Sequence, residues 1–363
     1  MSLRADEIGR LRLEAQRIGG PASSPAAVVK WLVAVQAQDP LAARWALGAR
    51  HAADSEDDVI AALDSGRLLR THLMRGTWQY VTPGDLHWLL ELLAPRVRGY
   101  AERRHHQLGL SPRARSRCEA VLARELEQAG ALTRVEAREV LRRAGLPTHE
   151  QRLSHLLIDA ELSGLLCSGP MKRGQSTWAL VDARVPRRGR ARSRDAALAE
   201  LAHRYFASRG PATLADFRWW TGLTTADAKD AHGAICSGLE SATVDGRTLW
   251  WAPTTTRGPG DALLPPFDEF LIAYQDRRDV LDPRHVSRVN AGGGLLAPII
   301  VAEGRVVGTW RRTLAARHVE VSLSLFGAAR RDAKALARHV EAYARFLGVD
   351  ARQGRTSRGR ARR

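Results

Sequence analysis

Apolar residues along this chain recur first at helical spacing and then in short alternating runs, and this change of period occurs three times. In each case amphipathic helices are followed by a short strand pair that ends on a tryptophan. The strand pairs lie at residues 68–82, 165–182 and 239–253. Because the spacing between the copies is irregular, the pattern predicts a repeat of architecture rather than of sequence.

The second and third copies carry a helix–turn–helix signal upstream of the strand pair. Thr133 with Glu136, and Thr213 with Asp216, have the spacing of capping boxes and predict a helix that starts after a turn. Helix–turn–helix followed by a hairpin is the pattern of a winged helix, a module that usually binds DNA and also binds proteins. We therefore predict an α+β fold, mainly α, with three tandem winged-helix domains.

From about residue 261 the pattern changes to strands, which are expected in ALLPPFDEFLIAYQDRR, APIIVAEGRVVGTWRR and HVEVSLSLF. A tight hairpin is expected at VAEGRVVG, a flexible loop at AGGG (291–294), and a closing helix at DAKALARHVEAYARFLG. Asp268 and Glu269 lie in an apolar strand context. They are either reactive carboxylates or hydrogen-bond partners of nearby arginines, and we favour the second interpretation.

These patterns divide the chain into five parts. They are winged-helix domains at 1–103, 104–184 and 185–260, a β-rich segment with the closing helix at 261–350, and a disordered basic tail at 351–363. The third domain begins with VPRRGRARSRD, which has Pro, Gly and five Arg and is typical of an exposed linker.

Charge narrows the class of partner. Lys plus Arg is 56 and Asp plus Glu is 39 among 363 residues, so the net charge is +17. Without the six arginines of the tail the net charge is still +11. Such an excess favours an acidic partner, double-stranded DNA first.

Cysteine usage and hydropathy exclude several classes of protein. Cys118, Cys167 and Cys236 are scattered and form no CxxC pair, which argues against disulfides, a zinc site or an iron–sulfur cluster. No apolar run is long enough to be a signal segment or to span a bilayer. We expect a cytoplasmic, nucleoid-associated monomer that needs no cofactor.

Basic residues at the predicted hairpin turns are candidate DNA contacts. MRGTW and MKRGQ place Arg75, Lys172 and Arg173 where they can reach phosphates or enter a minor groove. The alternative is that they are solvated turn charges. Further candidate DNA contacts in the C-terminal part are Arg277, Arg311 and Arg312.

Two amides stand out in the stretch KWLVAVQAQDPLAARW, residues 30–45, namely Gln36 and Gln38. Ser24 as N-cap and Pro25 predict a helix that ends near Gln38. A second helix should start with Asp39 as its cap and Pro40 in its first turn, because residues before proline leave the α region.

A helix end that runs into extended backbone allows residues i and i+2 to converge on one site. Gln36 and Gln38 can then form a paired-amide site beside a helix N-terminus, a favourable place for a phosphate. The alternative is that both glutamines only cap helix ends.

Four stretches resemble the AlkZ-type DNA glycosylases, bacterial enzymes built from tandem winged helices. They are VQAQDP, RGTWQYVT, LLPPFDEFLIAYQDR and VVGTWRR, and the resemblance extends in the right order to about residue 348. The Gln-x-Gln motif of the family maps onto Gln36 and Gln38, which implies that both are catalytic. Relatives of the same superfamily that carry Gln-x-Asp at these positions belong to its general-repair branch. The Gln-x-Gln form of this chain therefore indicates the self-resistance branch. Many members read TWH where this chain has Thr77-Trp78-Gln79.

The resemblance implies a monofunctional DNA glycosylase that excises bulky 7-alkylguanine adducts made by a DNA-alkylating natural product, and in some members also unhooks interstrand crosslinks. Alkylation at ring nitrogen seven gives guanine a positive charge, so the base leaves without a general acid. Two amide carbonyls suffice to orient a water and to stabilise the oxocarbenium-like transition state. The alternative function is a non-catalytic winged-helix transcription factor or architectural DNA-binding protein.

Overall fold

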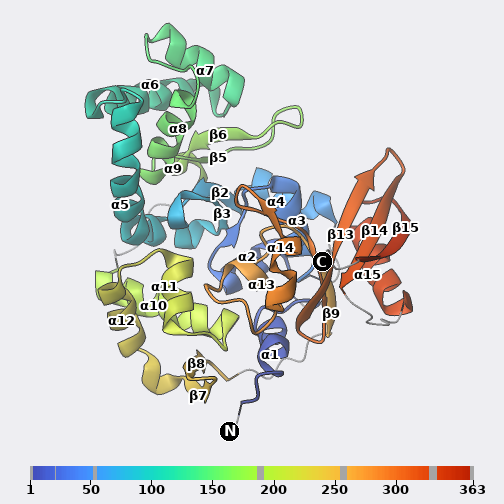
Figure 1. The fold of residues 1–363 in the computed structure, drawn as a ribbon. Coiled ribbons are helices and arrows are strands. Elements are labelled where there is room, and N and C mark those ends of the chain that lie inside the picture. The colour runs from blue at the N-terminus through green and yellow to red at the C-terminus, as the bar shows by residue number, and fades with distance from the viewer. Residues whose placement is uncertain are drawn as a thin grey trace.

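The computed structural model describes residues 3–20, 22–51, 55–185, 192–253, 260–326 and 333–359. Up to residue 253 one order of elements recurs three times, and we call the three copies units 1 to 3 (Figure 1). Each unit has a helix, a short extended segment, two further helices and a strand pair. The fold is α+β, as predicted.

Unit 1 contains the glutamine motif. Its elements are α2 (Pro25–Leu32), β1 (Val35–Gln36), α3 (Pro40–Gly48), α4 (Glu56–Asp64), β2 (Leu69–His72) and β3 (Trp78–Val81). The strands form a sheet of order β1-β3-β2, so the glutamine-bearing strand pairs with the second strand of the hairpin.

Unit 2 repeats this order at the far end of a long helix. Helix α5 (Pro83–Gln107) leads to it and crosses the domain boundary expected after residue 103 (Figure 1). The elements of unit 2 are α6 (Pro112–Ala129), β4 (Leu132–Thr133), α7 (Arg134–Arg143), α8 (Arg152–Leu162), β5 (Leu166–Ser168) and β6 (Thr177–Leu180). Its sheet has the order β4-β6-β5, which matches that of unit 1.

Unit 3 has a reduced sheet. Its elements are α10 (Arg194–Arg209), α11 (Leu214–Thr221), α12 (Thr225–Gly233), β7 (Glu240–Val244) and β8 (Arg247–Trp251). In place of a first strand, Ala212 forms an isolated bridge with Trp250. The expected linker at 185–195 lies mostly outside the described residues.

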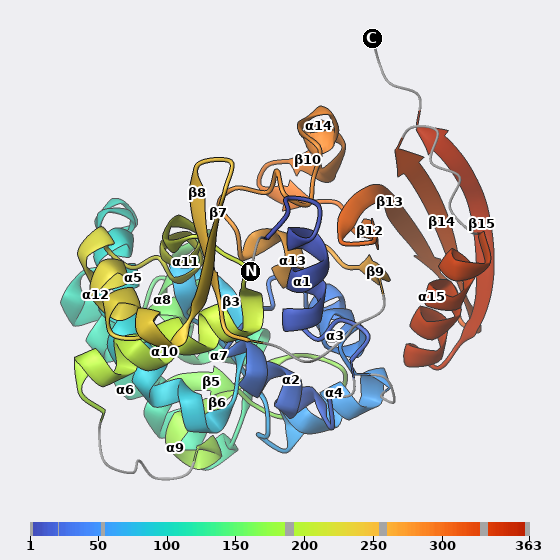
Figure 2. The same ribbon diagram turned by 90° about the horizontal axis from the view of Figure 1, so that it is seen from below.

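The C-terminal part forms a five-stranded sheet of order β15-β14-β13-β12-β9. Its strands are β9 (Asp261–Leu264), β12 (Ile299–Ala302), β13 (Arg305–Leu314), β14 (His318–Phe326) and β15 (Asp350–Gly359). Helix α15 (Ala333–Phe346) covers one face of it (Figure 2). Between β9 and β12 lie α13 (Glu269–Ile272), α14 (Val286–Val289), β10 (Asn290–Gly292) and β11 (Leu295–Leu296).

Two apolar cores bind unit 1 to the rest of the molecule. One core joins α2, α3 and Tyr80 of unit 1 to the C-terminal sheet and α15. The other joins the opposite side of unit 1 and α5 to α10 and α11 of unit 3. Unit 2 has a core largely of its own. Unit 1 is therefore clamped between unit 3 and the C-terminal sheet.

Local signals for helix starts are confirmed. Ser24 and Asp39 cap α2 and α3 through their side chains, with proline at the next position in both. Thr133 with Glu136, and Thr213 with Asp216, form complete capping boxes. The tight hairpin at VAEGRVVG is also confirmed, with Glu303 and Gly304 both at positive φ.

Three expectations about backbone structure are wrong. The first motif helix ends at Leu32 rather than near Gln38, because Val35–Gln36 pair with β3. The AGGG loop forms the turn of the β10–β11 hairpin. The tail forms β15 up to Gly359 instead of being disordered, because it adds a parallel strand to the edge of β14.

A fourth correction concerns the first predicted C-terminal strand. Strand β9 ends at Leu264, and two prolines follow it. Asp268 then caps α13 with its side chain, so Asp268 and Glu269 begin a helix and do not lie in a strand.

Candidate active site

A strained turn places the first glutamine. Val33 has φ 67° and ψ −54°, and the N–H of Ala34 donates to the carbonyl of Leu32 at 2.7 Å, which makes a γ-turn. Such a conformation costs about 1–3 kcal/mol for a residue with a side chain and persists only where the surroundings impose it. The turn ends α2 and directs the chain into β1.

A buried ion pair imposes this turn. Arg209 of α10 donates to the carbonyls of Leu32 and Ala34 at 2.9 and 3.0 Å and pairs with Glu269 at 2.8 Å. Glu269 also accepts hydrogen bonds from the backbone N–H of Gln36 at 3.1 Å and from Trp220 Nε1 at 2.9 Å. Both side chains are fully buried, so Glu269 has a structural role and fixes the positions of Arg209 and of the Gln36 backbone. This confirms that Glu269 is a hydrogen-bond partner of an arginine.

Asp268 has the same kind of role. It accepts two hydrogen bonds from Arg50 at 2.8 and 2.9 Å, and both side chains are buried. Our interpretation of Asp268 as an arginine partner is therefore confirmed. Neither carboxylate of the FDEF stretch lines the cavity beside the glutamine motif.

The two glutamines differ in their local structure, because Gln36 is buried in β1 and Gln38 is exposed beyond its end. Gln36 is opposite Gln79 in the β1–β3 ladder, and the N–H of Ala37 continues the pairing to the carbonyl of Trp78 at 2.7 Å. Strand β1 ends at Gln36, and Gln38 lies in the bend that follows it. Gln38 is exposed, and its Oε1 accepts from the N–H of Trp78 at 3.4 Å.

Gln36 opens into a cavity of about 490 Å³. The walls come from unit 1, from α11 of unit 3 and from the segment between β9 and β12. The lining residues are Gln36, Arg75, Thr77, Trp219, Phe267, Ile272, Arg277, Asn290, Gly292, Gly294, Leu295 and Leu296. None of these described lining residues is a carboxylate, a histidine or a lysine, so the side chains around Gln36 offer no general acid or base near neutral pH.

Arg75 is turned into this cavity. Its backbone is left-handed, with φ 54°, in the turn between β2 and β3. One guanidinium nitrogen donates to the carbonyls of Trp219 and Trp220 at 3.0 and 3.2 Å, and the other donates to Gln36 Oε1 at 3.2 Å. Burial lowers the pKa of Arg75, and the negative charge of Glu269 opposes this shift.

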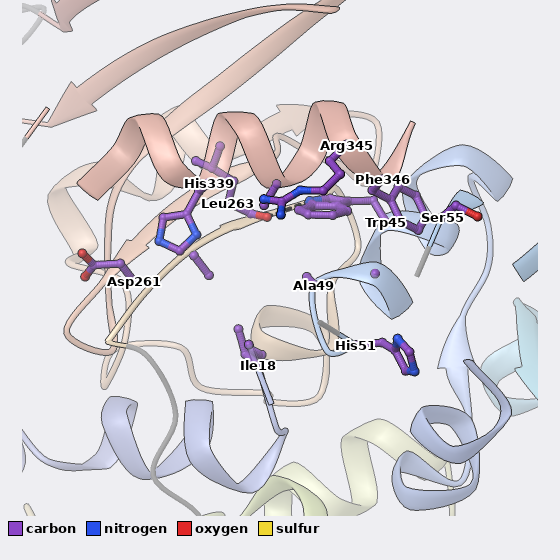
Figure 3. A pocket seen from close by; sticks show the side chains of 14 residues that line it. Ile18, Trp45, Ala49, His51, Ser55, Asp261, Leu263, His339, Arg345 and Phe346 are labelled. Atoms are coloured by element: carbon purple, nitrogen blue, oxygen red, sulfur yellow. Dashed lines mark hydrogen bonds between the residues drawn. The ribbon is translucent and has the colours of Figure 1, made fainter. Parts of the chain in front are cut away.

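A second cavity, of about 500 Å³, lies under α15 and shares no lining residue with the first (Figure 3). Trp45 and Phe346 form its apolar wall. His339 and Asp261 lie toward one end and Ser55 toward the other, so its polar groups do not converge on one point. The cavity at Gln36 is the better candidate for a reaction site.

Comparison with known proteins shows the family of this chain. The family model for DNA glycosylase AlkZ-like proteins matches residues 29–346. The chain belongs to this DNA glycosylase family. Membership makes the chain an enzyme of DNA repair, and its matched region contains both glutamines and every described residue of the cavity lining.

A curated relative and a solved structure support the assignment. The relative is an interstrand DNA cross-link repair glycosylase from Streptomyces sahachiroi, 27% identical in an alignment of 313 residues that covers 80% of this chain and 83% of the relative. The solved structure is Streptomyces sahachiroi DNA glycosylase AlkZ, with a TM-score of 0.81 and 26% identity. The superposition covers 99% of this chain and 100% of the chain in the solved structure.

The structure brings together part of the predicted set of site residues in this DNA glycosylase. Gln36, Arg75 and Arg277 line one cavity, whereas Gln38 is exposed and is not among its described lining residues. Arg277 donates from Nε to the carbonyl of Leu271 at 3.0 Å, and burial lowers its pKa.

The other predicted DNA contacts lie apart from the cavity lining. Lys172 and Arg173 are exposed in the β5–β6 turn, where Lys172 Nζ pairs with Glu136 at 2.5 Å. Arg311 is exposed on β13. Arg312 is half-buried and donates to the hydroxyl of Tyr343 on α15.

Five apolar lining residues were missed by sequence reasoning, namely Trp219, Phe267, Ile272, Leu295 and Leu296. The adjacent pair Trp219-Trp220 is a usable signal, because one helix rarely buries two neighbouring tryptophans on the same side. Leu295 follows the glycine run, which we expected to be a loop.

Gln79 of the Thr77-Trp78-Gln79 stretch lies beside the motif. It is buried and donates from Nε2 to Thr77 Oγ1 at 2.8 Å. As the cross-strand neighbour of Gln36, it adds another neutral amide next to the cavity and no titrating group.

No described helix is long and apolar enough to cross a membrane. Nor do the described side chains contain a group of three or more His, Cys, Asp or Glu with the arrangement of a metal site.

Proposed function

We propose that this enzyme is a monofunctional glycosylase that releases bulky 7-alkylguanine bases from duplex DNA, with Gln36 and Gln38 as its catalytic groups. The three units act as winged helices, because each has the order of helix, extended segment, two helices and hairpin. We propose double-stranded DNA as the substrate and a monomer as the active form.

The observation that carries this proposal is that the described lining of the Gln36 cavity holds no carboxylate, histidine or lysine. The described lining has no side chain that can protonate a leaving base. A 7-alkylguanine needs none, because it already carries a positive charge. The electrons of the glycosidic bond neutralise the base as it leaves, and water adds to the sugar carbon and loses its proton to solvent. Amide carbonyls can orient this water and stabilise the sugar cation.

The absence of an amine nucleophile among the described lining residues supports monofunctional chemistry. A glycosylase that also cuts the strand forms a covalent imine with a lysine or amine. We therefore expect an intact strand with an abasic site as the product.

Cavity size supports a bulky substrate. At about 490 Å³ the cavity is in the range of sites that hold drug-sized molecules. A base extruded from the duplex could carry a large substituent there. Because the relative from Streptomyces sahachiroi is named an interstrand cross-link repair glycosylase, we extend the proposal to crosslinked guanines and to self-resistance against a DNA-alkylating natural product.

The test uses a duplex with a single 7-alkylguanine bearing a bulky substituent. Chromatography should detect free adducted base, and the strand should break only after heating in alkali. Borohydride should trap no covalent complex. Gln107→Ala, which removes an exposed glutamine on α5, serves as the control for Gln36→Ala. If the enzyme binds the duplex tightly but the adducted base stays attached, the alternative of a non-catalytic DNA-binding protein would be favoured.

A further inference from the structure

We propose that Trp219 is the platform on which the positively charged base stacks, and that it makes this enzyme prefer cationic lesions to neutral ones of the same shape. This inference rests on the proposed function, because it concerns how the same cavity chooses its substrate.

Trp219 is exposed although it is a large aromatic residue on a packed helix. Its relative exposure is 43%, whereas that of the neighbouring Trp220 is 2%. The open side chain lines the same cavity as Gln36. An exposed aromatic surface inside a reaction cavity costs solvation free energy unless a ligand covers it, which suggests that the substrate does so.

The ring of Trp219 is held firmly. Its Nε1 donates to the carbonyl of Ile272 at 3.2 Å, and its own carbonyl accepts from Arg75 at 3.0 Å. A ring fixed through both its indole nitrogen and its backbone loses little entropy when a base stacks on it. The geometry is therefore preorganised before DNA arrives.

The charge around the cavity shows why such a platform is needed. Arg75 and Arg277 are the charged residues of the described lining, and both are positive. The carboxylate that acts most strongly on Arg75, Glu269, lies outside the described lining and is paired with Arg209. A cationic base therefore enters a cavity whose net charge repels it.

An aromatic face offers negative potential without a negative charge. Tryptophan binds cations best among the aromatic side chains, and its attraction grows when water is excluded. The guanidinium carbon of Arg75 already lies 5.5 Å from the Trp219 ring centroid, so this ring interacts with a cation in the structure. The neighbouring apolar side chains of Leu295 and Phe267 can surround the neutral edge of the base.

The stacking role also agrees with the neutral glutamines. A carboxylate in the cavity would attract any cation, including the arginines that line it. A π face selects a flat cation that can lie against the ring. Trp219 is therefore a specificity-determining residue, whereas Gln36 and Gln38 perform the chemistry.

Two duplex probes that resist cleavage test this inference through binding alone. One carries 2′-fluoro-7-methylguanosine, whose base is cationic. The other carries 7-methyl-7-deazaguanine, which has the same shape and no charge. The wild-type enzyme should bind the cationic probe roughly three- to tenfold more tightly. Trp219→Phe should keep part of the preference, and Trp219→Leu should reduce it to less than about twofold.

Tyr100→Leu is the matched control. Tyr100 is an exposed aromatic on α5 with the guanidinium carbon of Arg96 4.9 Å from its ring centroid, and it does not line the cavity. Its replacement should leave the preference unchanged. Trp219→Met preserves apolar bulk and gives a second variant without a π face, to be used if Trp219→Leu lowers the unfolding midpoint.

Separate outcomes distinguish the two proposals. A wild-type enzyme that releases 7-methylguanine but binds both probes equally overturns the stacking role and leaves the glycosylase proposal intact. A folded Trp219→Leu or Trp219→Met variant with the wild-type preference does the same. A wild-type enzyme that prefers the cationic probe but releases no base from cleavable DNA contradicts the proposed function and leaves the stacking role standing.

Discussion

The hairpin turns of unit 1 and unit 2 share a pair of left-handed residues and differ in their surroundings. In unit 1, Arg75 and Gly76 have φ values of 54° and 70°. In unit 2, Arg173 and Gly174 have 52° and 76°. Yet Arg75 reaches into the cavity while Arg173 is exposed. Local sequence therefore makes the same turn twice, and the neighbouring elements decide what its arginine does.

The neighbour responsible for the difference is α11 of unit 3. Its last carbonyls carry the negative end of the helix dipole, and two of them accept hydrogen bonds from Arg75. The unit 2 turn contacts unit 1 through the N–H of Met171, which donates to Asp64 at 2.7 Å, while Lys172 pairs with Glu136 of its own unit at the surface. There the hydrogen bond from Lys172 lowers the pKa of Glu136 to about 2. An exposed pair of this kind adds little to stability, so Lys172 can exchange it for a phosphate.

The largest effect should come from removing the amides that the unit 1 hairpin supports. Gln36→Ala and Gln38→Ala should each slow base release by on the order of a hundredfold, because each removes a preorganised polar group. The double variant should lose little more than the worse single one, because both act on one water and one cation. Single-turnover release of 7-alkylguanine measures this, with thermal unfolding as the check on folding.

A smaller loss is expected when the Arg75 contact to Gln36 is removed. Arg75→Met should lower the rate of base release roughly tenfold, because it leaves the amide of Gln36 without its orienting donor. Arg75→Lys should retain part of the rate, since lysine supplies a hydrogen-bond donor but not the planar pair of donors of the guanidinium group. Single-turnover rates at saturating and subsaturating enzyme concentration separate an effect on the chemical step from an effect on DNA binding. A change in affinity with an unaltered maximal rate would make Arg75 a plain DNA contact.

The unit 2 hairpin should show the opposite behaviour. Lys172→Ala with Arg173→Ala should weaken binding several-fold to damaged and undamaged duplex alike, because phosphate contacts carry no lesion information. The slope of log affinity against log salt should fall by about 2, one for each lost contact. Titrations at several salt concentrations give both numbers. Loss of affinity for damaged DNA alone would assign these residues to lesion recognition.

The smallest effect concerns pH, again with the two regions in contrast. At the C-terminal end of α5, burial lowers the pKa of His105, and Arg115 lowers it further; in unit 2, burial also lowers the pKa of His155. Each folded-state pKa lies below the unfolded value, so the stabilisation is present above about pH 6.5 and is lost as pH falls. His105→Asn should flatten the fall of the unfolding midpoint between pH 7 and 5.

Base release should not share this pH dependence. No described lining residue titrates near neutrality, so single-turnover rates should be flat between about pH 6 and 8 at a temperature where the protein stays folded. A bell-shaped profile in that range would show that a titrating group takes part in the chemistry.

The sequence alone determined the features that depend on neighbouring residues. Caps at Ser24, Asp39, Thr133 and Thr213 follow from side chains that reach backbone N–H groups within one turn. The hairpin at residues 303–304 was expected from a short Glu-Gly turn between two apolar runs, and both turn residues have positive φ. The glutamine motif was also recognisable, because its residue types and spacing lie in one short stretch.

Tertiary structure decided what those local features do. Gln36 lies in a strand because β3 pairs with it, and the γ-turn before it persists because Arg209, 177 residues beyond Leu32, holds its carbonyls. Trp219 faces the cavity because α11 packs against the unit 1 hairpin. Such contacts join segments far apart in the chain, and no local pattern encodes them. Capping and turn geometry act within a few residues, whereas a reaction site needs several distant segments to pack together.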